Sequence, residues 1–86
     1  VVLAIEYLGR SVLLTGDLES PGLEAVLAEA PYDCDVLLAP HHGSAGSNPL
    51  GFAGWCQPEH VIISGGYDVQ PSVISAYESD GAEVLH

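Results

Sequence analysis

Basic residues are almost missing from this sequence. Arg10 is the only lysine or arginine among 86 residues, against 12 acidic residues, so the formal net charge is −11. Proteins bind nucleic-acid phosphates mainly through lysine and arginine, and this surface alone is therefore not expected to bind DNA or RNA. Hydrophobic residues make up 48% of the chain, which excludes a disordered acidic tail.

Methionine and long apolar runs are missing too. The chain begins at Val1 in a strand-like stretch, and residues 82–86 are again apolar and strand-like. Natural termini are usually polar and loose, so we predict that the chain is a fragment of a longer protein. No apolar run reaches the roughly 18 residues of a transmembrane helix. The opening VVLAI also lacks the length and the basic flank of a signal peptide.

Cysteine is scarce, with Cys34 and Cys56 lying 22 residues apart. This spacing matches no zinc motif. The two residues could form a disulfide if the domain lies outside the cytoplasm, but two small buried thiols are the favoured interpretation.

Hydrophobic periodicity predicts alternating strands and helices, in the order β-β-α-β-α-β-α-β of a layered α/β domain. Ser20 is predicted to cap the first helix, with Pro21 at its first position. Its apolar stripe comprises Leu23, Val26, Leu27 and Ala30. The other predicted elements are a hairpin of strands 1–7 and 11–15, strands 35–39 and 60–64 buried on both faces, helices 49–56 and 71–81, and a strand 83–86.

Three of the predicted strands end in polar or glycine-rich segments. These are Thr15-Gly16-Asp17, Pro40-His41-His42-Gly43-Ser44 and Ser64-Gly65-Gly66. Functional groups in α/β sheets gather at the carboxyl ends of strands. If these strands are parallel neighbours, all three segments lie on one rim of the sheet.

The chemistry of this rim is predicted to depend on Asp17, His41 and His42. A carboxylate at the edge of a core can be held charged by a metal ion, although a turn or capping aspartate also suits Asp17. Neutral imidazole is a common metal ligand. Successive side chains point in opposite directions, so one of the two histidines is expected to reach a given metal. His60, at a strand start, is predicted to be structural or exposed.

Small residues after the histidines favour a close approach of backbone N–H groups to an anion. Gly43, Ser44 and Ser47 are therefore the candidate substrate-binding residues, with a flexible loop as the alternative interpretation.

The sequence resembles the metallo-β-lactamase domain of the ComEC/Rec2 family over nearly its whole length. The matching segments, in order, are LLTGDLE (13–19), Glu24, DVLLAPHHGS (35–44), Ser47 and VIISGG (61–66). HHGS after a buried strand, following a strand-ending GD, is a fairly specific combination. The resemblance implies that residues 1–86 are the C-terminal half of a metallo-β-lactamase αββα sandwich, which would leave an apolar sheet face uncovered.

The resemblance also implies roles for the rim residues. Asp17 would bridge two divalent metal ions, zinc or manganese, and His41 or His42 would supply a further ligand, with His41 favoured because it lies nearer the strand. The metals would activate water for phosphodiester hydrolysis. In this family the domain belongs to a bacterial membrane protein that imports single-stranded DNA. That implies a soluble, extracytoplasmic domain without direct membrane contact, partnered by its own N-terminal half-domain.

Two departures from the family pattern keep other functions open. The family's first ligand motif lies in the preceding half of the domain and is absent here, so the chain alone is expected to be inactive. Gln70-Pro71 also stands where the family often has His-Pro. The alternatives are a small-molecule hydrolase, such as a lactonase or phosphorylcholine esterase, and a degenerate module without catalysis.

Overall fold

A computed structural model describes residues 2–64 and 69–85, with the backbone only at His41, Ala45 and Leu50. Two 3-10 turns, Pro40–Gly43 and Ala45–Ser47, follow β3. The strands are β1 (Leu3–Tyr7), β2 (Arg10–Leu14), β3 (Val36–Leu38), β4 (His60–Ile62) and β5 (Glu83–Leu85), and the helices are α1 (Gly22–Leu27), α2 (Leu50–Cys56) and α3 (Pro71–Glu78).

The strands form one mixed sheet in the order β1-β2-β3-β4-β5. β1 and β2 pair antiparallel through a tight turn, in which Leu8 and Gly9 both have positive φ angles of 50° and 79°. Two such residues are typical of the hairpin turn that matches strand twist. β2, β3, β4 and β5 are parallel, because a helix lies between each consecutive pair. The predicted α/β class is confirmed.

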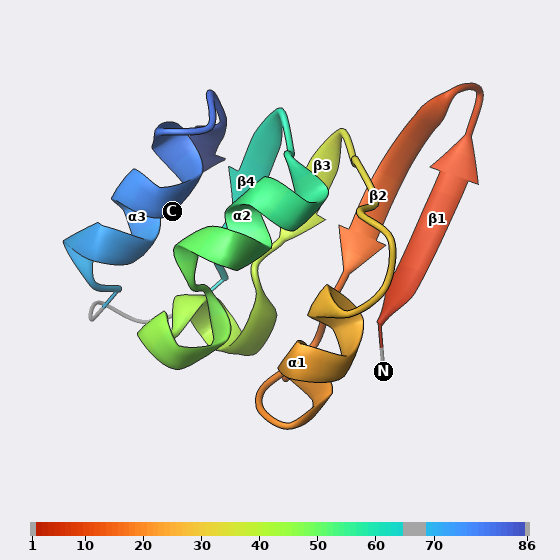
Figure 1. The fold of residues 1–86 in the computed structure, drawn as a ribbon. Coiled ribbons are helices and arrows are strands. Elements are labelled where there is room, and N and C mark those ends of the chain that lie inside the picture. Colours follow the sequence, from red (N-terminus) through yellow and green to blue (C-terminus); the bar gives the residue numbers. More distant parts are fainter. Residues whose placement is uncertain (1, 65–68, 86) are drawn as a thin grey trace.

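All three helices lie on one face of the sheet (Figure 1). Leu13, Leu37 and Val61 occupy matching positions on β2, β3 and β4 and are buried beneath the helices. Phe52 of α2 and Tyr77 of α3 are fully buried on the same side. Side chains alternate across a strand, so this set forms a single layer of core between sheet and helices.

The opposite face of the sheet is apolar and only partly covered. Val12, Leu14, Val36 and Leu38 are half-buried. Ile62 is 40% exposed, and further residues of this face are exposed on the two edge strands: Leu3, Ile5, Tyr7 and Leu85. We call these nine residues the bare face. The expectation that strands 35–39 and 60–64 are buried on both faces is therefore wrong for this chain, since the described helices cover one side.

Two local predictions for the first helix are wrong. Pro21, not Ser20, occupies the N-cap position of α1, which has no side-chain cap, and the Ser20 hydroxyl donates to the Glu24 carboxylate at 2.5 Å. Ala30 is exposed and lies beyond the helix end. The stripe formed by Leu23, Val26 and Leu27 does pack against the core.

The two remaining predicted helices are confirmed. α2 forms despite two internal glycines, since Phe52, Ala53 and Cys56 bury one side of it completely. α3 begins at Pro71, and the chain turns after it at Gly81, whose φ of 88° suits glycine. Within residues 2–64 and 69–85, no helix is long and apolar enough to cross a lipid bilayer.

We predict that the bare face drives self-association of the chain. An exposed apolar surface of this extent promotes contacts between molecules, while the net charge of −11 opposes them. Sedimentation velocity at neutral pH should detect oligomers, and precipitation should follow as the pH falls toward the isoelectric point near 4.2. Ile5→Glu or Ile62→Glu should shift the distribution to monomer. The exposed control Ser75→Glu on α3 adds the same charge and should have less effect; equal effects would contradict the prediction.

Candidate functional site

The predicted rim corresponds to one edge of the parallel sheet. Leu14, Leu38 and Ile62, the last residues of β2, β3 and β4, lie side by side in register. The segments that follow these strands therefore leave the sheet at the same edge (Figure 1). This satisfies the condition on which the shared site was predicted. Gly65 and Gly66, the end of the third segment, lie outside the described residues.

A buried threonine joins the ends of β2 and β3. Thr15 is fully buried, and its hydroxyl donates to the carbonyl oxygen of Leu38 at 2.6 Å. The chain then turns at Gly16, whose φ is 55°, and the Leu18 N–H closes the turn on the Thr15 carbonyl oxygen at 3.1 Å. Asp17 is exposed in this turn. Its position suits both interpretations drawn from the sequence, a turn aspartate and an open carboxylate ligand.

His42 is held in an unusual backbone conformation next to the end of β4. Its φ is 52°. This left-handed conformation is energetically unfavourable for any residue that has a side chain. The side chain is exposed, and its Nδ1 lies 2.6 Å from the carbonyl oxygen of Ser64. A carbonyl oxygen only accepts hydrogen bonds, so Nδ1 carries the proton. In the neutral ring, Nε2 is then the nitrogen with a lone pair.

Gly43 allows the loop to pack directly on the strand that follows. Its φ is 81°, it is buried, and an added Cβ would lie 2.7 Å from Cγ2 of Ile63. The close approach that this glycine permits is thus the approach of the loop to the sheet. Its predicted role in binding an anion remains a prediction.

Asn48 clamps the loop that carries both histidines. Its side chain is 2% exposed, and its Nδ2 donates to the carbonyl oxygens of Pro40 at 2.9 Å and Ser44 at 2.7 Å. The Tyr77 hydroxyl of α3 donates to the Asn48 Oδ1. No pattern in the sequence singled out this residue. Asparagine before proline indicates a turn, but the partner on α3 lies 29 residues away and left no local pattern.

The two serines predicted to bind substrate lie on either side of the second turn after β3, with Ser44 directly before it and Ser47 as its last residue. The Ser47 N–H donates to the Ser44 carbonyl oxygen at 3.2 Å. Ser44 is half-buried, whereas Ser47 is 2% exposed. A shallow surface pocket is lined by both serines together with Gly46, Glu19 and Ser20 from the α1 side. The structure therefore brings Ser44 and Ser47 together, although Ser47 offers little accessible surface.

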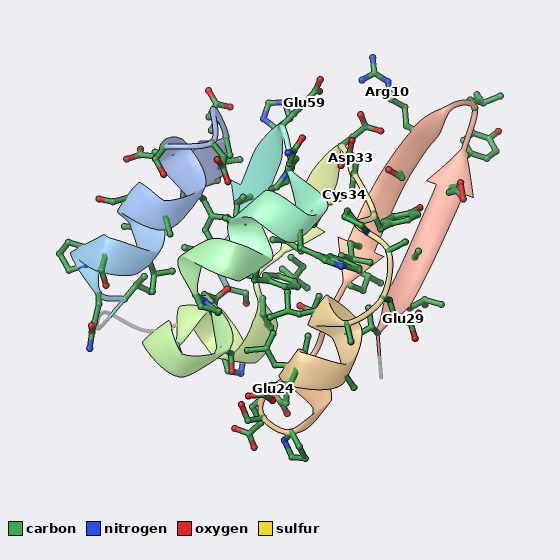
Figure 2. All side chains as sticks on the ribbon, viewed as in Figure 1. Arg10, Glu24, Glu29, Asp33, Cys34 and Glu59 are labelled. Carbon is green, nitrogen blue, oxygen red and sulfur yellow. The ribbon has the colours of Figure 1, made fainter. Side chains whose placement is uncertain are left out.

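The positive charge of the chain lies at the opposite edge of the sheet. Arg10 begins β2, and its guanidinium lies 3.8 Å from the Asp35 carboxylate and 3.9 Å from that of Glu59. Figure 2 shows Arg10 and Glu59 at the far end of the molecule from Glu24 of α1. The Ser20 hydroxyl lowers the pKa of Glu24 by hydrogen bonding to its carboxylate. The rim thus lies away from the only arginine or lysine of the sequence.

His60 behaves as predicted. It begins β4 at the edge opposite the rim, and its Nδ1 lies 3.2 Å from the carboxylate of Glu83 in an exposed pair. Among the side chains that the structure describes, no group of three or more His, Cys, Asp or Glu residues could hold a metal ion. His41 lies in the first 3-10 turn, with only its backbone described.

Comparison with known proteins finds a relative that matches most of this chain. The chain is 45% identical over 67 residues to ComE operon protein 3 of Bacillus subtilis (strain 168). The matched region covers 77% of this chain but 9% of that relative. No family model matches the sequence.

We predict that Asn48 and Tyr77 act together in stabilising the loop. Asn48→Ala removes the hydrogen bonds to two loop carbonyl oxygens and leaves the buried Tyr77 hydroxyl without its acceptor, and should lower the free energy of unfolding by about 2 kcal/mol or more. Tyr77→Phe should cost about 1 kcal/mol. The double variant should lose less free energy of unfolding than the two single variants lose in sum, since both single variants lose the same hydrogen bond. Urea denaturation measures all three, with the exposed Tyr7→Phe as a control expected to stay within about 0.5 kcal/mol of the unmodified chain.

We also predict unequal costs for two glycine substitutions. Gly9 and Gly43 have nearly the same φ, 79° and 81°, but an added Cβ meets nothing within 4 Å at Gly9. Gly9→Ala should cost about 1 kcal/mol for the left-handed backbone alone. Gly43→Ala should cost roughly 3 kcal/mol, because the methyl group also overlaps Ile63. Equal unfolding free energies for the two variants would show that the contact with Ile63 is unimportant.

Proposed function

We propose that this chain is the C-terminal half of a metal-dependent phosphodiesterase domain, of the metallo-β-lactamase type, in a DNA-uptake protein. The observation that carries the proposal is the shared edge of β2 and β3. The GD segment with Asp17 and the PHHG segment with His41 and His42 leave adjacent parallel strands there. A carboxylate and an imidazole at neighbouring strand ends form the core of a divalent-metal site.

The Bacillus relative supports the biological setting. It is named for a competence operon, and its 45% identity spans most of this chain. We infer a shared role in DNA uptake during competence. The chain spans 9% of the length of that relative, so the membrane channel, the single-stranded DNA substrate and the extracytoplasmic location all belong to the proposal.

The residues present at the rim fit a divalent cation. The hydrogen bond between His42 Nδ1 and the Ser64 carbonyl oxygen fixes the ring orientation and presents Nε2 as the coordinating nitrogen. Histidine ligands of metals are commonly held in this way by a backbone carbonyl. The structure thus supports His42 as the ligand, whereas the sequence favoured His41. Asp17, exposed at the end of β2, is the second ligand that we propose.

The remaining ligands are proposed to come from the N-terminal half of the same domain. Zinc sites use three or four protein ligands, and two are available from this rim. Zinc or manganese bound there would lower the pKa of a coordinated water molecule and so provide the nucleophile for phosphodiester hydrolysis. The N-terminal half-domain would also supply a second sheet. That sheet would cover the bare face, including its exposed residues Ile62 and Leu85.

The scarcity of basic side chains bears on how such a domain would bind DNA. Arg10 is occupied by Asp35 and Glu59 at the opposite edge, so phosphate neutralisation at the rim would fall to the metal ions and to other parts of the parent protein. Gly43, Ser44 and Ser47 are proposed to shape the substrate side of the loop that Asn48 clamps, where half-buried Ser44 is the most accessible of the three. If metal ions rather than basic side chains bind the substrate, hydrolysis should depend strongly on the metal and only weakly on the DNA sequence.

One observation favours a domain without catalysis. Gln70 is exposed at the N-cap of α3, where the family often carries a histidine. If that histidine contacts phosphate in the family, this protein has lost the contact. Measured hydrolysis by the parent protein separates the two functions.

We predict that Asp17→Asn and His42→Ala abolish metal-dependent hydrolysis of single-stranded DNA by the parent protein. Each removes one proposed ligand, so activity with added manganese should fall at least about 100-fold, since even groups that only orient ligands contribute about 10–100-fold. His60→Ala is the matched control, because His60 lies at the opposite edge of the same sheet. It should retain activity.

The isolated 86-residue chain should be inactive and should bind metal weakly. A chain that cleaves single-stranded DNA alone, and loses this on Asp17→Asn, would contradict the half-site. Parent protein that binds metal through Asp17 but hydrolyses no phosphodiester would support the alternative of a degenerate module.

A further inference from the structure

Cys34 and Cys56 lie together in the core, at the side of the sheet away from the rim. Both are free thiols in the structure, 5% and 0% exposed, and both belong to the single hydrophobic core. Cys34 lies in the segment that leads into β3, beside Asp33 (Figure 2), and Cys56 is the last residue of α2. Neither residue takes part in the site described above.

The backbone geometry of the pair suits a disulfide. The Cys34 N–H donates to the Cys56 carbonyl oxygen at 2.9 Å, and the Tyr32 N–H donates to the Trp55 carbonyl oxygen at 3.2 Å. Standard bond lengths and angles then keep the two cysteine Cα atoms within about 6.8 Å of each other. Native disulfides span about 4.4–6.8 Å between Cα atoms, so the backbones are already within the allowed range.

The two thiols also interact with each other. The Cys56 Sγ lies 3.2 Å from the carbonyl oxygen of Phe52, one turn back in α2. The same S–H hydrogen can instead turn to the sulfur of Cys34, and that hydrogen bond lowers the pKa of Cys34 against the opposing effects of burial and of the neighbouring carboxylates of Asp35 and Asp33. Donation to Cys34, together with burial, raises the pKa of Cys56.

We propose that Cys34 and Cys56 are a dithiol–disulfide pair, which a disulfide oxidant converts into an intramolecular crosslink. The Cys34 thiolate attacks a sulfur atom of the oxidant and expels one oxidant thiol, forming a mixed disulfide. Cys56 then loses its proton, attacks the Cys34 sulfur and expels the second thiol. Two protein thiols are oxidised, two electrons pass to the oxidant disulfide, and two protons leave the protein.

The order of these steps follows from exposure. Cys34 retains 5% of its surface, while Cys56 has none. Residues 30–34, which precede β3, form no helix or strand, so this segment can open locally to admit an oxidant. The second step is intramolecular and requires no access from solvent.

The crosslink would enclose the segment that carries the histidines. Residues 35–55 contain β3, the loop held by Asn48 and most of α2. A disulfide at the two ends of this segment would restrict its unfolded conformations. Oxidation would thus stabilise the segment without altering the rim, and the inference is independent of the proposed hydrolase activity.

The test uses dilute native chain, oxidised glutathione as the oxidant and intact-mass spectrometry as the readout. The chain should become lighter by two hydrogen atoms as a monomer, and peptide mapping should join Cys34 to Cys56. Thermal unfolding of the oxidised chain should occur roughly 10 °C above that of the reduced chain. Reduction with dithiothreitol should reverse both changes.

Matched serine variants test the order of reaction. Cys56→Ser should retain one glutathione on Cys34, whereas Cys34→Ser should react several-fold more slowly, because its remaining thiol is fully buried. Oxidant should raise the unfolding temperature of neither variant. Native chain that keeps both thiols, while urea-unfolded chain is oxidised, would overturn the proposal. So would crosslinks that form only between molecules.

Discussion

The parallel register of β2, β3 and β4 is the constraint on which the rest of the molecule depends. Leu13, Leu37 and Val61 match across these strands and are buried beneath the helices. A shift of one residue would turn this apolar row to the opposite face. Because these residues match across the strands, the strand ends are aligned too, and the polar segments after them leave the sheet together. The site is thus a consequence of core packing.

The alignment alone would leave the PHHG loop loosely placed, and three local contacts determine its path. The Thr15 hydroxyl joins the ends of β2 and β3. Asn48 bonds two loop carbonyls and receives the Tyr77 hydroxyl of α3. Gly43 packs against Ile63. These contacts support the left-handed backbone of His42, whose strain persists only because its surroundings determine it.

The two faces of the sheet divide the roles of the chain. One face is covered by α1, α2 and α3 and contains the core with the cysteine pair (Figure 1). The other carries Ile5, Ile62 and Leu85 with 40% or more of their surface exposed. A second sheet packed there would both bury this surface and bring further ligands to the rim. The proposed half-domain relationship would therefore provide one partner both for the apolar face and for the proposed two-ligand site.

Much of the fold could be predicted from the sequence, because periodicity and turn residues are local signals. They predicted the α/β class, the helix opened by Pro71 and the glycine-containing helix that ends at Cys56. They also identified Asp17, His41 and His42 as residues at strand ends. The predicted Ser20 cap was wrong by one residue, since Pro21 occupies the N-cap position and the Ser20 hydroxyl bonds the Glu24 side chain. Only the tertiary structure decided which face stays bare, that Asn48 reaches Tyr77 and that His42 Nδ1 meets Ser64. Each of these depends on segments more than 20 residues apart, and such contacts form no local pattern in a sequence.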